Sequence, residues 1–239
     1  MWGWRAKIGF VIPCGDYVQE LDAFNMAPEG VSVHFTRMPS PQPFTADALM
    51  CSLSQDLDRH LQLLTPLAAD VIVFGCIAGS FLRGPGYDEM IARNIAKITG
   101  SKATTASTSV VAALRALNLK KISVLAPYKS EIVQKLEAFL KGNGLEVLRT
   151  KALDLDTDLE MAKVSPESIY QLARDVDVPE ADGVFISCTT FRAADVIEDL
   201  ERDLEKPVVT ANQGSMWNAL RMACIRDRID GYGQLFKKC

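Results

Sequence analysis

Short β-branched runs alternate with amphipathic segments along the whole chain, and this alternation constrains the fold more than any other feature of the sequence. It is typical of βα units that build parallel sheets. The apolar character of each run is nearly continuous, which indicates strands buried on both faces. The sequence therefore predicts an α/β fold with strands at residues 8–13, 31–38, 71–76, 122–128, 145–153, 183–188 and 208–212.

The segment 130–144 shows the helical pattern most clearly. Ile132, Leu136 and Leu140 recur every four residues, so they fall on one face of a helix. Ser130 is a candidate N-cap, and the glycines after Leu140 are candidate stop signals. We expect this helix to cover one face of a sheet.

The chain also repeats its own layout. The interval from Ile8 to Cys76 is 68 residues and that from Ile122 to Cys188 is 66, and each cysteine is expected to end a buried strand. No low-complexity linker separates the halves, so we expect two pseudo-symmetric lobes, each a mostly parallel sheet flanked by helices, with the active site in the cleft between them. The alternative is that the two intervals are similar by chance. The expected N-terminal lobe is 1–106 plus 213–239, and the C-terminal lobe is 107–212.

Composition and charge exclude several kinds of partner. The formal net charge is only -4 and the basic residues are scattered, which argues against binding of nucleic acid. No apolar run reaches the length of about 18 residues that a membrane span needs, and no signal peptide is recognisable. The sequence thus predicts a cytoplasmic protein, and it leaves open whether copies form a homo-oligomer.

The six cysteines form neither a CxxC pair nor a cluster with histidine. We therefore expect free thiols and no metal site. Only two histidines are present, which leaves no Ser-His-Asp arrangement. Cys51 and Cys224 fall in helical patterns and are expected in the core, whereas Cys14 belongs to the first loop and could approach the site.

Ligands of open parallel sheets bind beyond the carboxyl ends of the strands, where Cys76 and Cys188 are expected. The residues after each cysteine are small, apolar or hydroxylated and are expected where a turn opens into a helix. The free N–H groups at the start of that helix would bind a carboxylate, and the positive field of the helix start would lower the pKa of the thiol. These candidate substrate-binding residues are Ile77, Ala78, Thr189 and Thr190. A buried, inert cysteine is the alternative in each case.

Two facing thiols can perform two related reactions on a small carboxylic acid. Moving a proton from one face of a carbon to the other inverts its configuration and requires an acid-base group on each side. Alternatively, a thiolate adds to a double bond, the bond rotates, and the thiolate leaves. Cys76 and Cys188 are therefore candidate catalytic residues of a racemase or a cis-trans isomerase.

Several segments together resemble the aspartate/glutamate racemase superfamily, within it the branch of maleate cis-trans isomerase and arylmalonate decarboxylase. They are FGCIAGS around Cys76, LAPY ending at Tyr128, AKVSPE, ISCTTFR around Cys188, NQGSMW and the terminal GYGQLF. The resemblance covers nearly the whole chain. It implies two pseudo-symmetric α/β lobes, a catalytic cysteine from each lobe, and neither a metal nor an organic cofactor.

The same resemblance suggests roles for individual residues. The decarboxylases look to have glycine at the position of Cys76, so two cysteines favour an isomerase. Tyr128 matches a tyrosine that binds a substrate carboxylate, although it could simply cap the strand end. Asp16 stands where maleate isomerases look to have asparagine. A carboxylate there would repel a dianion and hints at a substrate with an amine or amide; helix capping is its alternative role.

Two other functions remain open from the sequence. A decarboxylase of the same fold would use Cys188 as proton donor, with Cys76 incidental. A two-lobe small-molecule binding protein would use neither cysteine, because a fold does not by itself imply catalysis. Asn212 and Gln213, which follow the last predicted strand, could orient a substrate or tie down the last loop.

Overall fold

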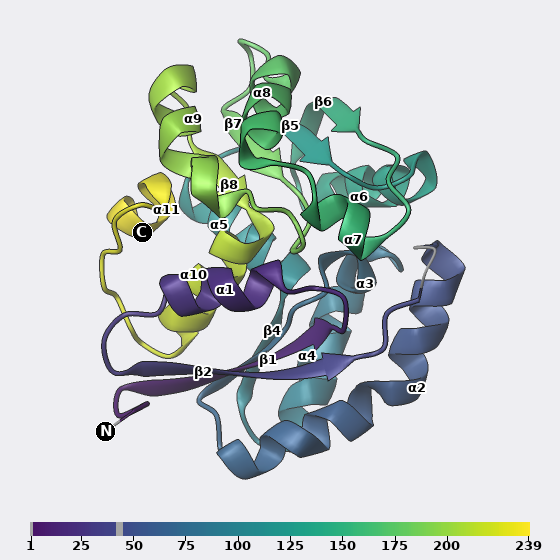
Figure 1. Ribbon diagram of the computed structural model, residues 1–239, viewed down its shortest axis with the longest axis vertical. Helices are drawn as coiled ribbons and strands as arrows, with labels where there is room; N and C mark the ends of the chain where they lie inside the picture. The colour runs from purple at the N-terminus through teal and green to yellow at the C-terminus, as the bar shows by residue number, and fades with distance from the viewer. Residues whose placement is uncertain (1, 42–44) are drawn as a thin grey trace.

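Two four-stranded parallel sheets organise the molecule (Figure 1). The structure is a computed structural model that describes residues 2–41 and 45–239, with the side chains of all of these except residues 50–56. The first sheet has the order β2-β1-β3-β4 and the second β6-β5-β7-β8. Because the second order repeats the first with each number raised by four, the two lobes have the same topology, as predicted.

The strands of the first sheet are β1 (Ala6–Pro13), β2 (Val31–Met38), β3 (Val71–Phe74) and β4 (Lys102–Thr105). Those of the second are β5 (Lys121–Ala126), β6 (Glu146–Ala152), β7 (Gly183–Ile186) and β8 (Val208–Thr210). The central strands β3 and β7 are buried throughout, as expected for parallel strands covered by helices on both faces.

Helices connect successive strands and cover both sheets. They are α1 (Val18–Asn25), α2 (Ala46–Leu64), α3 (Ile77–Phe81), α4 (Tyr87–Thr99), α5 (Ala106–Ala116), α6 (Ser130–Gly142), α7 (Asp158–Ala162), α8 (Pro166–Val176), α9 (Ile197–Leu204), α10 (Ala211–Met222) and α11 (Gly233–Lys238). Threonines cap several of them; Thr157 and Thr210 each form a reciprocal capping box. No helix in the described part of the chain is both long and apolar enough to cross a membrane.

The predicted strands are all present, and β4 is one that the sequence analysis missed. Its sequence, KATT, is short and begins at the exposed Lys102, so it lacks the apolar run that marks the other strands. The helix predicted at 130–144 is α6, but it begins differently from the expectation. Lys129 occupies the N-cap position and no side chain caps the helix, whereas Ser130 is already its first residue.

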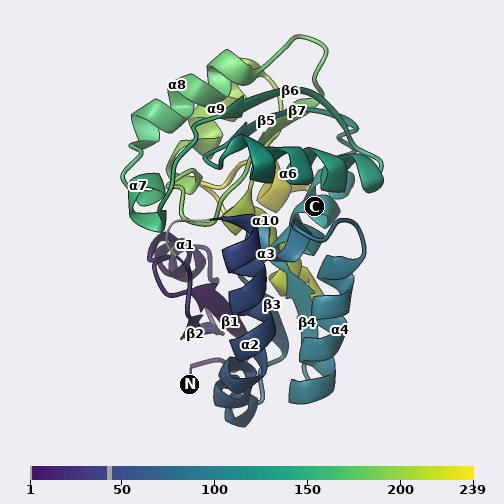
Figure 2. The same cartoon turned by 90° about the vertical axis from the view of Figure 1, so that its right-hand side faces the viewer.

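The lobes meet along the carboxyl edges of their sheets. Figure 2 shows one lobe above the other, with α3 and α6 in contact where the lobes join. The long helix α10 follows β8 of the second sheet but packs on α1, α5 and β3 as well as on β8. Helix α10 thus contacts elements of both lobes, and the assignment of residues 213–239 to the N-terminal lobe stays a prediction.

Candidate active site

Cys76 and Cys188 come from different lobes and line the same cavity. Cys76 follows β3 and Cys188 follows β7, which occupy equivalent positions in the two sheets. The other lining residues are Pro13, Ile77, Ala78, Tyr128, Asp158, Met161, Thr189 and Thr190. The structure therefore gathers all the residues predicted for the site except Asp16, whose side chain adjoins Thr189.

Cys76 is held at the start of a short helix. It is the N-cap residue of α3, and its Sγ accepts a hydrogen bond from the Gly79 N–H at 3.4 Å. Ile77 and Ala78 form the buried first turn of α3. This helix is fixed to the start of α5, because the Ser80 hydroxyl donates to Ser107 Oγ at 2.7 Å. Cys76 is thus presented on a rigid support.

Cys188 lies in a strained turn. Its φ angle is 106°, which L-residues other than glycine rarely adopt, and such strain is concentrated at functional sites. The Thr190 N–H donates to Cys188 Sγ at 3.3 Å. The helix expected directly after Cys188 is absent. Residues 189–191 form a turn and a bend, and the first helical turn is the short 3-10 helix Ala194–Val196.

Both thiols have a high pKa. Burial raises the pKa of Cys76 and of Cys188 to about 12, and the negative charges of Asp16 and Asp158 act in the same direction. The N–H groups that reach each sulfur lower the pKa, but less than loss of water raises it. The local backbone thus lowers the thiol pKa as predicted, but the expected net result, a thiol pKa below its usual value, is wrong because burial has the larger effect.

Tyr128 lies two residues beyond β5 and is almost fully buried. Its ring packs edge-on against Phe81, with the ring centroids 6.3 Å apart. Burial raises the pKa of Tyr128 well above its usual value. The phenol is therefore neutral at pH 7 and able to donate a hydrogen bond to a carboxylate.

Asp16 is completely buried, and its two carboxylate oxygens have different hydrogen-bond surroundings. Oδ1 accepts hydrogen bonds from the N–H groups of Val18 and Gln19, both at 3.0 Å, and so caps α1. Oδ2 accepts no hydrogen bond of ordinary geometry among the described residues, although the Thr189 side chain is near enough to lower the pKa. The net effect of burial is to raise the pKa of Asp16 to about 6.

Asp158 is a lining residue that the sequence analysis missed. It is the first residue of α7, only 5% exposed, and its Oδ2 accepts a hydrogen bond from the Ser40 hydroxyl at 3.2 Å. A signal was present in the sequence. Thr157 and Glu160 have the spacing of a capping box just after a predicted strand, which places a helix start at the carboxyl edge of the sheet.

Asn212 connects the loop after Cys188 to α1. Its Nδ2 donates to the Thr189 carbonyl at 2.8 Å and to Asp22 Oδ2 at 2.7 Å, and its Oδ1 accepts from Gln19 Nε2 at 3.3 Å. Gln213 instead donates to a backbone carbonyl in the loop before α11. Of the two roles considered from the sequence, Gln213 thus ties down the last loop. Asn212 instead holds the Thr189 carbonyl in the turn after Cys188.

The remaining cysteines whose side chains are described do not line the cavity. Cys14 is exposed and is not among the lining residues. Cys224 is also exposed, at the end of α10, so its predicted place in the core is wrong. Cys51 lies in α2, but its side chain is outside the described residues. Among the described side chains, no three His, Cys, Asp or Glu are grouped as a metal site requires.

The cavity between the cysteines is nearly closed. The centre of a water molecule can occupy only about 10 Å³ of it, close to the minimum that holds one water. Met161 contributes to this closure, because its Sδ lies 3.8 Å from Cys188 Sγ. A larger hollow of about 700 Å³ lies between α6 and β6 but contains no cysteine. Entry of a substrate between the thiols therefore requires movement of the lining residues.

Comparison with known proteins places the chain among decarboxylases and isomerases. It is 24% identical to a maleate isomerase of Geobacillus stearothermophilus over 243 residues, covering 96% of both chains. It is 29% identical to an arylmalonate decarboxylase of Bordetella bronchiseptica over 180 residues, covering 74% of this chain and 75% of the relative.

Solved structures agree on the fold. The maleate isomerase Iso of Pseudomonas putida S16, in a cysteine-to-alanine variant with maleate, superposes with a TM-score of 0.92 at 21% identity, covering 97% of both chains. A double mutant of arylmalonate decarboxylase in the liganded form gives 0.91 at 25% identity, covering 98% of this chain and all of the other. The family model for arylmalonate decarboxylase matches residues 53–236, which is most of the sequence, so this chain belongs to the arylmalonate decarboxylase family.

Proposed function

We propose that the protein is a cofactor-independent isomerase of a small carboxylic acid and that Cys76 and Cys188 carry the reaction. The supporting observation is that two cysteines from equivalent strand ends line one cavity. Relatives named maleate isomerase match almost the whole chain. In one of them, from Nocardia farcinica, a cysteine-to-serine mutant holds a covalently bound succinylcysteine intermediate.

The two cysteines support either of two reaction paths. In a racemisation, one thiolate removes the proton from the substrate carbon, and the opposite thiol returns a proton to the other face. In a cis-trans isomerisation, the Cys76 thiolate forms a bond to one alkene carbon, and the former double bond rotates as a single bond. The C–S bond then breaks and the double bond returns. Neither path consumes a co-reactant.

The thiols must ionise before either path can begin. Because burial raises the pKa of both thiols, only a very small fraction of either is ionised at pH 7. Dehydration is the main cause of this high pKa, so opening of the cavity to admit the substrate also favours the thiolate. We place thiolate formation at this opening step.

Donors around the cavity suit a carboxylate. The neutral Tyr128 phenol is one, and the hydroxyls of Thr189 and Thr190 are others. At Cys76 the side chains of Ile77 and Ala78 are apolar, so only backbone N–H groups serve on that side. The substrate carboxylate is therefore expected to lie nearer to Tyr128 and the Thr189–Thr190 turn.

Decarboxylation is the second candidate, because the family model itself and the 29% identical relative carry that name. Cys188 would then act alone as proton donor. Substitution of Cys76 separates the two possibilities. Loss of turnover in Cys76→Ala supports the isomerase, whereas intact turnover together with loss in Cys188→Ala supports the decarboxylase.

The substrate can be found by hydrogen exchange. The protein is incubated in heavy water with small hydroxy, amino and dicarboxylic acids, and deuterium at the α-carbon is read by NMR. Loss of maleate is followed in the ultraviolet for the cis-trans path. Absence of exchange and of isomerisation, together with retained binding, would instead indicate a binding protein.

A further inference from the structure

We propose that Asp22 is a positioning residue for Cys188, because it holds Asn212 in the orientation in which Asn212 binds the turn after that cysteine. Asp22 lies in α1 of the first lobe and is 7% exposed, whereas Cys188 follows β7 of the second lobe. Asp22 is not among the described residues that line the cavity, so it acts through Asn212 and not on the substrate. The role rests on the proposed function, because it concerns one of the two cysteines that carry the reaction.

Asn212 joins α1 to the turn after Cys188 through two hydrogen bonds from one nitrogen. It is 4% exposed at the start of α10, which packs on α1 (Figure 1). Its Nδ2 carries two hydrogens, of which one is donated to Asp22 Oδ2 at 2.7 Å and the other to the Thr189 carbonyl at 2.8 Å. The opposite orientation of the amide would place Oδ1 against these two acceptor oxygens. The Asp22 carboxyl therefore selects the orientation that binds Thr189.

The Thr189 carbonyl and the Thr190 N–H belong to the same peptide unit. Because a peptide unit is planar, fixing its oxygen also fixes the direction of its N–H. That N–H donates to Cys188 Sγ at 3.3 Å. Asn212, at the oxygen end of the unit, thus aims the donor that reaches the sulfur from the nitrogen end.

The backbone at Cys188 requires such support. Its φ of 106° is strained for an L-residue, and a strained conformation persists only where the surrounding contacts hold it. Residues 189–191 form a turn and a bend, so the Thr189 carbonyl is not held within a helix. The contact from Asp22 and Asn212 supplies this hold and connects the Cys188 turn to α1.

The charge of Asp22 changes near neutral pH. Burial raises the pKa of its carboxyl to about 7, although the hydrogen bond from Asn212 lowers it. Above this pH the carboxylate accepts a charge-assisted hydrogen bond, which is about twice as strong as the neutral one. Protonation of Asp22 therefore weakens the hold on Asn212, and with it the hold on the Thr189 carbonyl.

Groups from three other segments act on the Asp22 carboxyl. The charges of Asp195 and Asp16 raise its pKa, and the charge of Arg192 lowers it. Arg192 and Asp195 both lie between β7 and α9 and pair with each other at 2.8 Å. Tyr232, just before α11, also faces Asp22; burial raises the pKa of this phenol, so it is uncharged at neutral pH.

Alkylation of the two cavity thiols tests the role of Asp22 without a substrate. Iodoacetamide labelling at pH 8, read by mass spectrometry, gives the ratio of the Cys188 rate to the Cys76 rate in the same molecule. General loosening of the fold speeds both rates, whereas loss of support for the Cys188 turn admits water to that thiol and raises the ratio. We expect Asp22→Ala to raise the ratio about three- to tenfold, as for loss of one hydrogen bond. Asp22→Asn keeps an acceptor oxygen and should raise it less.

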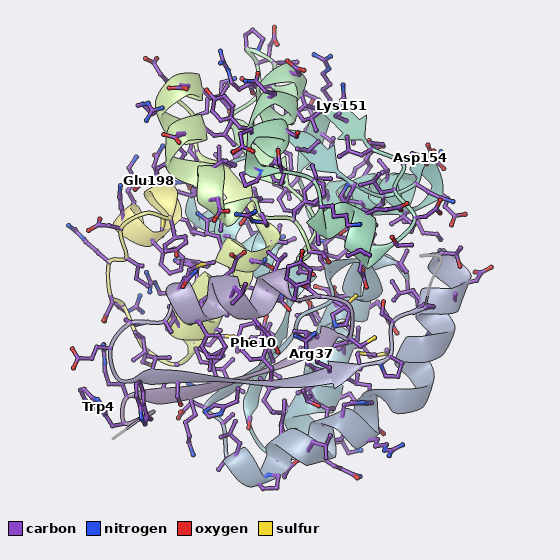
Figure 3. The ribbon with its side chains drawn as sticks, in the orientation of Figure 1. Trp4, Phe10, Arg37, Lys151, Asp154 and Glu198 are labelled. Carbon is purple, nitrogen blue, oxygen red and sulfur yellow. The ribbon has the colours of Figure 1, made fainter. Side chains whose placement is uncertain are left out.

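A double-mutant cycle shows whether Asp22 acts through Asn212. Asn212→Ala should also raise the ratio, and Asp22→Ala should add nothing to it in the Asn212→Ala background. Asp154→Asn is the matched control, because Asp154 is exposed and lies at the outer edge of the second lobe, away from α1 (Figure 3). Its φ of 58° is one that asparagine adopts readily, and this variant should keep the ratio of the parent protein.

NMR of isotope-labelled protein measures the pH dependence of the hold. The Thr190 N–H signal should shift with a midpoint near pH 7 in the parent and in Asp154→Asn, and Asp22→Asn should remove this step. In Asp16→Asn the step should move to lower pH, because the charge of Asp16 raises the pKa of Asp22. A purely structural role of Asp22 would produce no such step.

The outcomes separate the positioning role from the proposed function, because none of these measurements uses turnover. The role of Asp22 is overturned by an unchanged ratio in Asp22→Ala, by additive effects in the double variant, or by identical pH curves of Thr190 in the parent and Asp22→Asn. If the ratio depends on Asp22 but no acid is isomerised, the positioning role stands and the isomerase proposal fails. If an acid is isomerised while the ratio ignores Asp22, only the positioning role fails.

Discussion

Replacing Asp16 by asparagine should stabilise the protein at neutral pH and remove part of the pH dependence of its stability. The asparagine oxygen can accept the same hydrogen bonds from Val18 and Gln19 that Oδ1 now accepts, so the cap of α1 is kept. What disappears is a fully buried carboxyl group whose pKa burial raises from 3.8 to about 6.

The magnitude follows from the difference in pKa between the folded and unfolded chain. The unfolded chain loses the Asp16 proton at a lower pH than the folded protein, so the free energy of unfolding falls as the pH rises from about 4 to about 6. A difference of about two pKa units corresponds to about 3 kcal/mol. Asparagine is neutral throughout. The variant should therefore match the parent near pH 4 and exceed it by about 3 kcal/mol above pH 7.

Urea-induced unfolding at several pH values between 4 and 8 measures this difference. Burial raises the pKa of Asp22 to about 7, and the charge of Asp16 adds to this rise, so the loss of that charge in the variant changes the comparison in the same direction as the loss of the Asp16 carboxyl. Asp154→Asn, at an exposed position, serves as the control and should run parallel to the parent. If Asp16→Asn also loses stability in parallel with the parent, the buried Asp16 carboxyl does not titrate in this range and the reasoning is refuted.

Three further predictions concern the cysteines and their support. Cys76→Ala should lower racemisation about a thousandfold or more while Cys188 still exchanges the α-proton of one enantiomer, as NMR in heavy water can detect; Cys188→Ala should show the mirror preference. Mass spectrometry after iodoacetamide at pH 8 should find the exposed Cys14 alkylated before the two buried thiols, whose rates should rise about tenfold per pH unit; faster labelling of Cys76 would contradict its high pKa. Asn212→Ala should cost about 1–3 kcal/mol in urea unfolding and lower kcat more than it raises KM; an unchanged kcat would show that the Thr189 carbonyl needs no such support.

Periodicity and strand ends were sufficient to predict the α/β fold, the two similar lobes and the meeting of Cys76 with Cys188. These three features depend on apolar runs, which can be seen directly in the sequence. The short strand β4 was missed because its end is exposed and polar. Asp158 was missed because its place depends on how α7 of one lobe meets the first loops of the other, as its contact with Ser40 shows. The capping box of Thr157 and Glu160 marks where α7 begins, but no local pattern shows that Asp158 meets the other lobe.

The pKa of the two thiols is the property of the site that the neighbouring residues in the sequence predict least well. At Cys76 the helix start and the Gly79 N–H act as a local pattern predicts, lowering the pKa. Burial outweighs them, and the smaller effects of Asp158 and Asp16 act in the same direction as burial. Opening of the cavity to admit a substrate would return water to both thiols and so lower their pKa, which links substrate entry to activation of the cysteines.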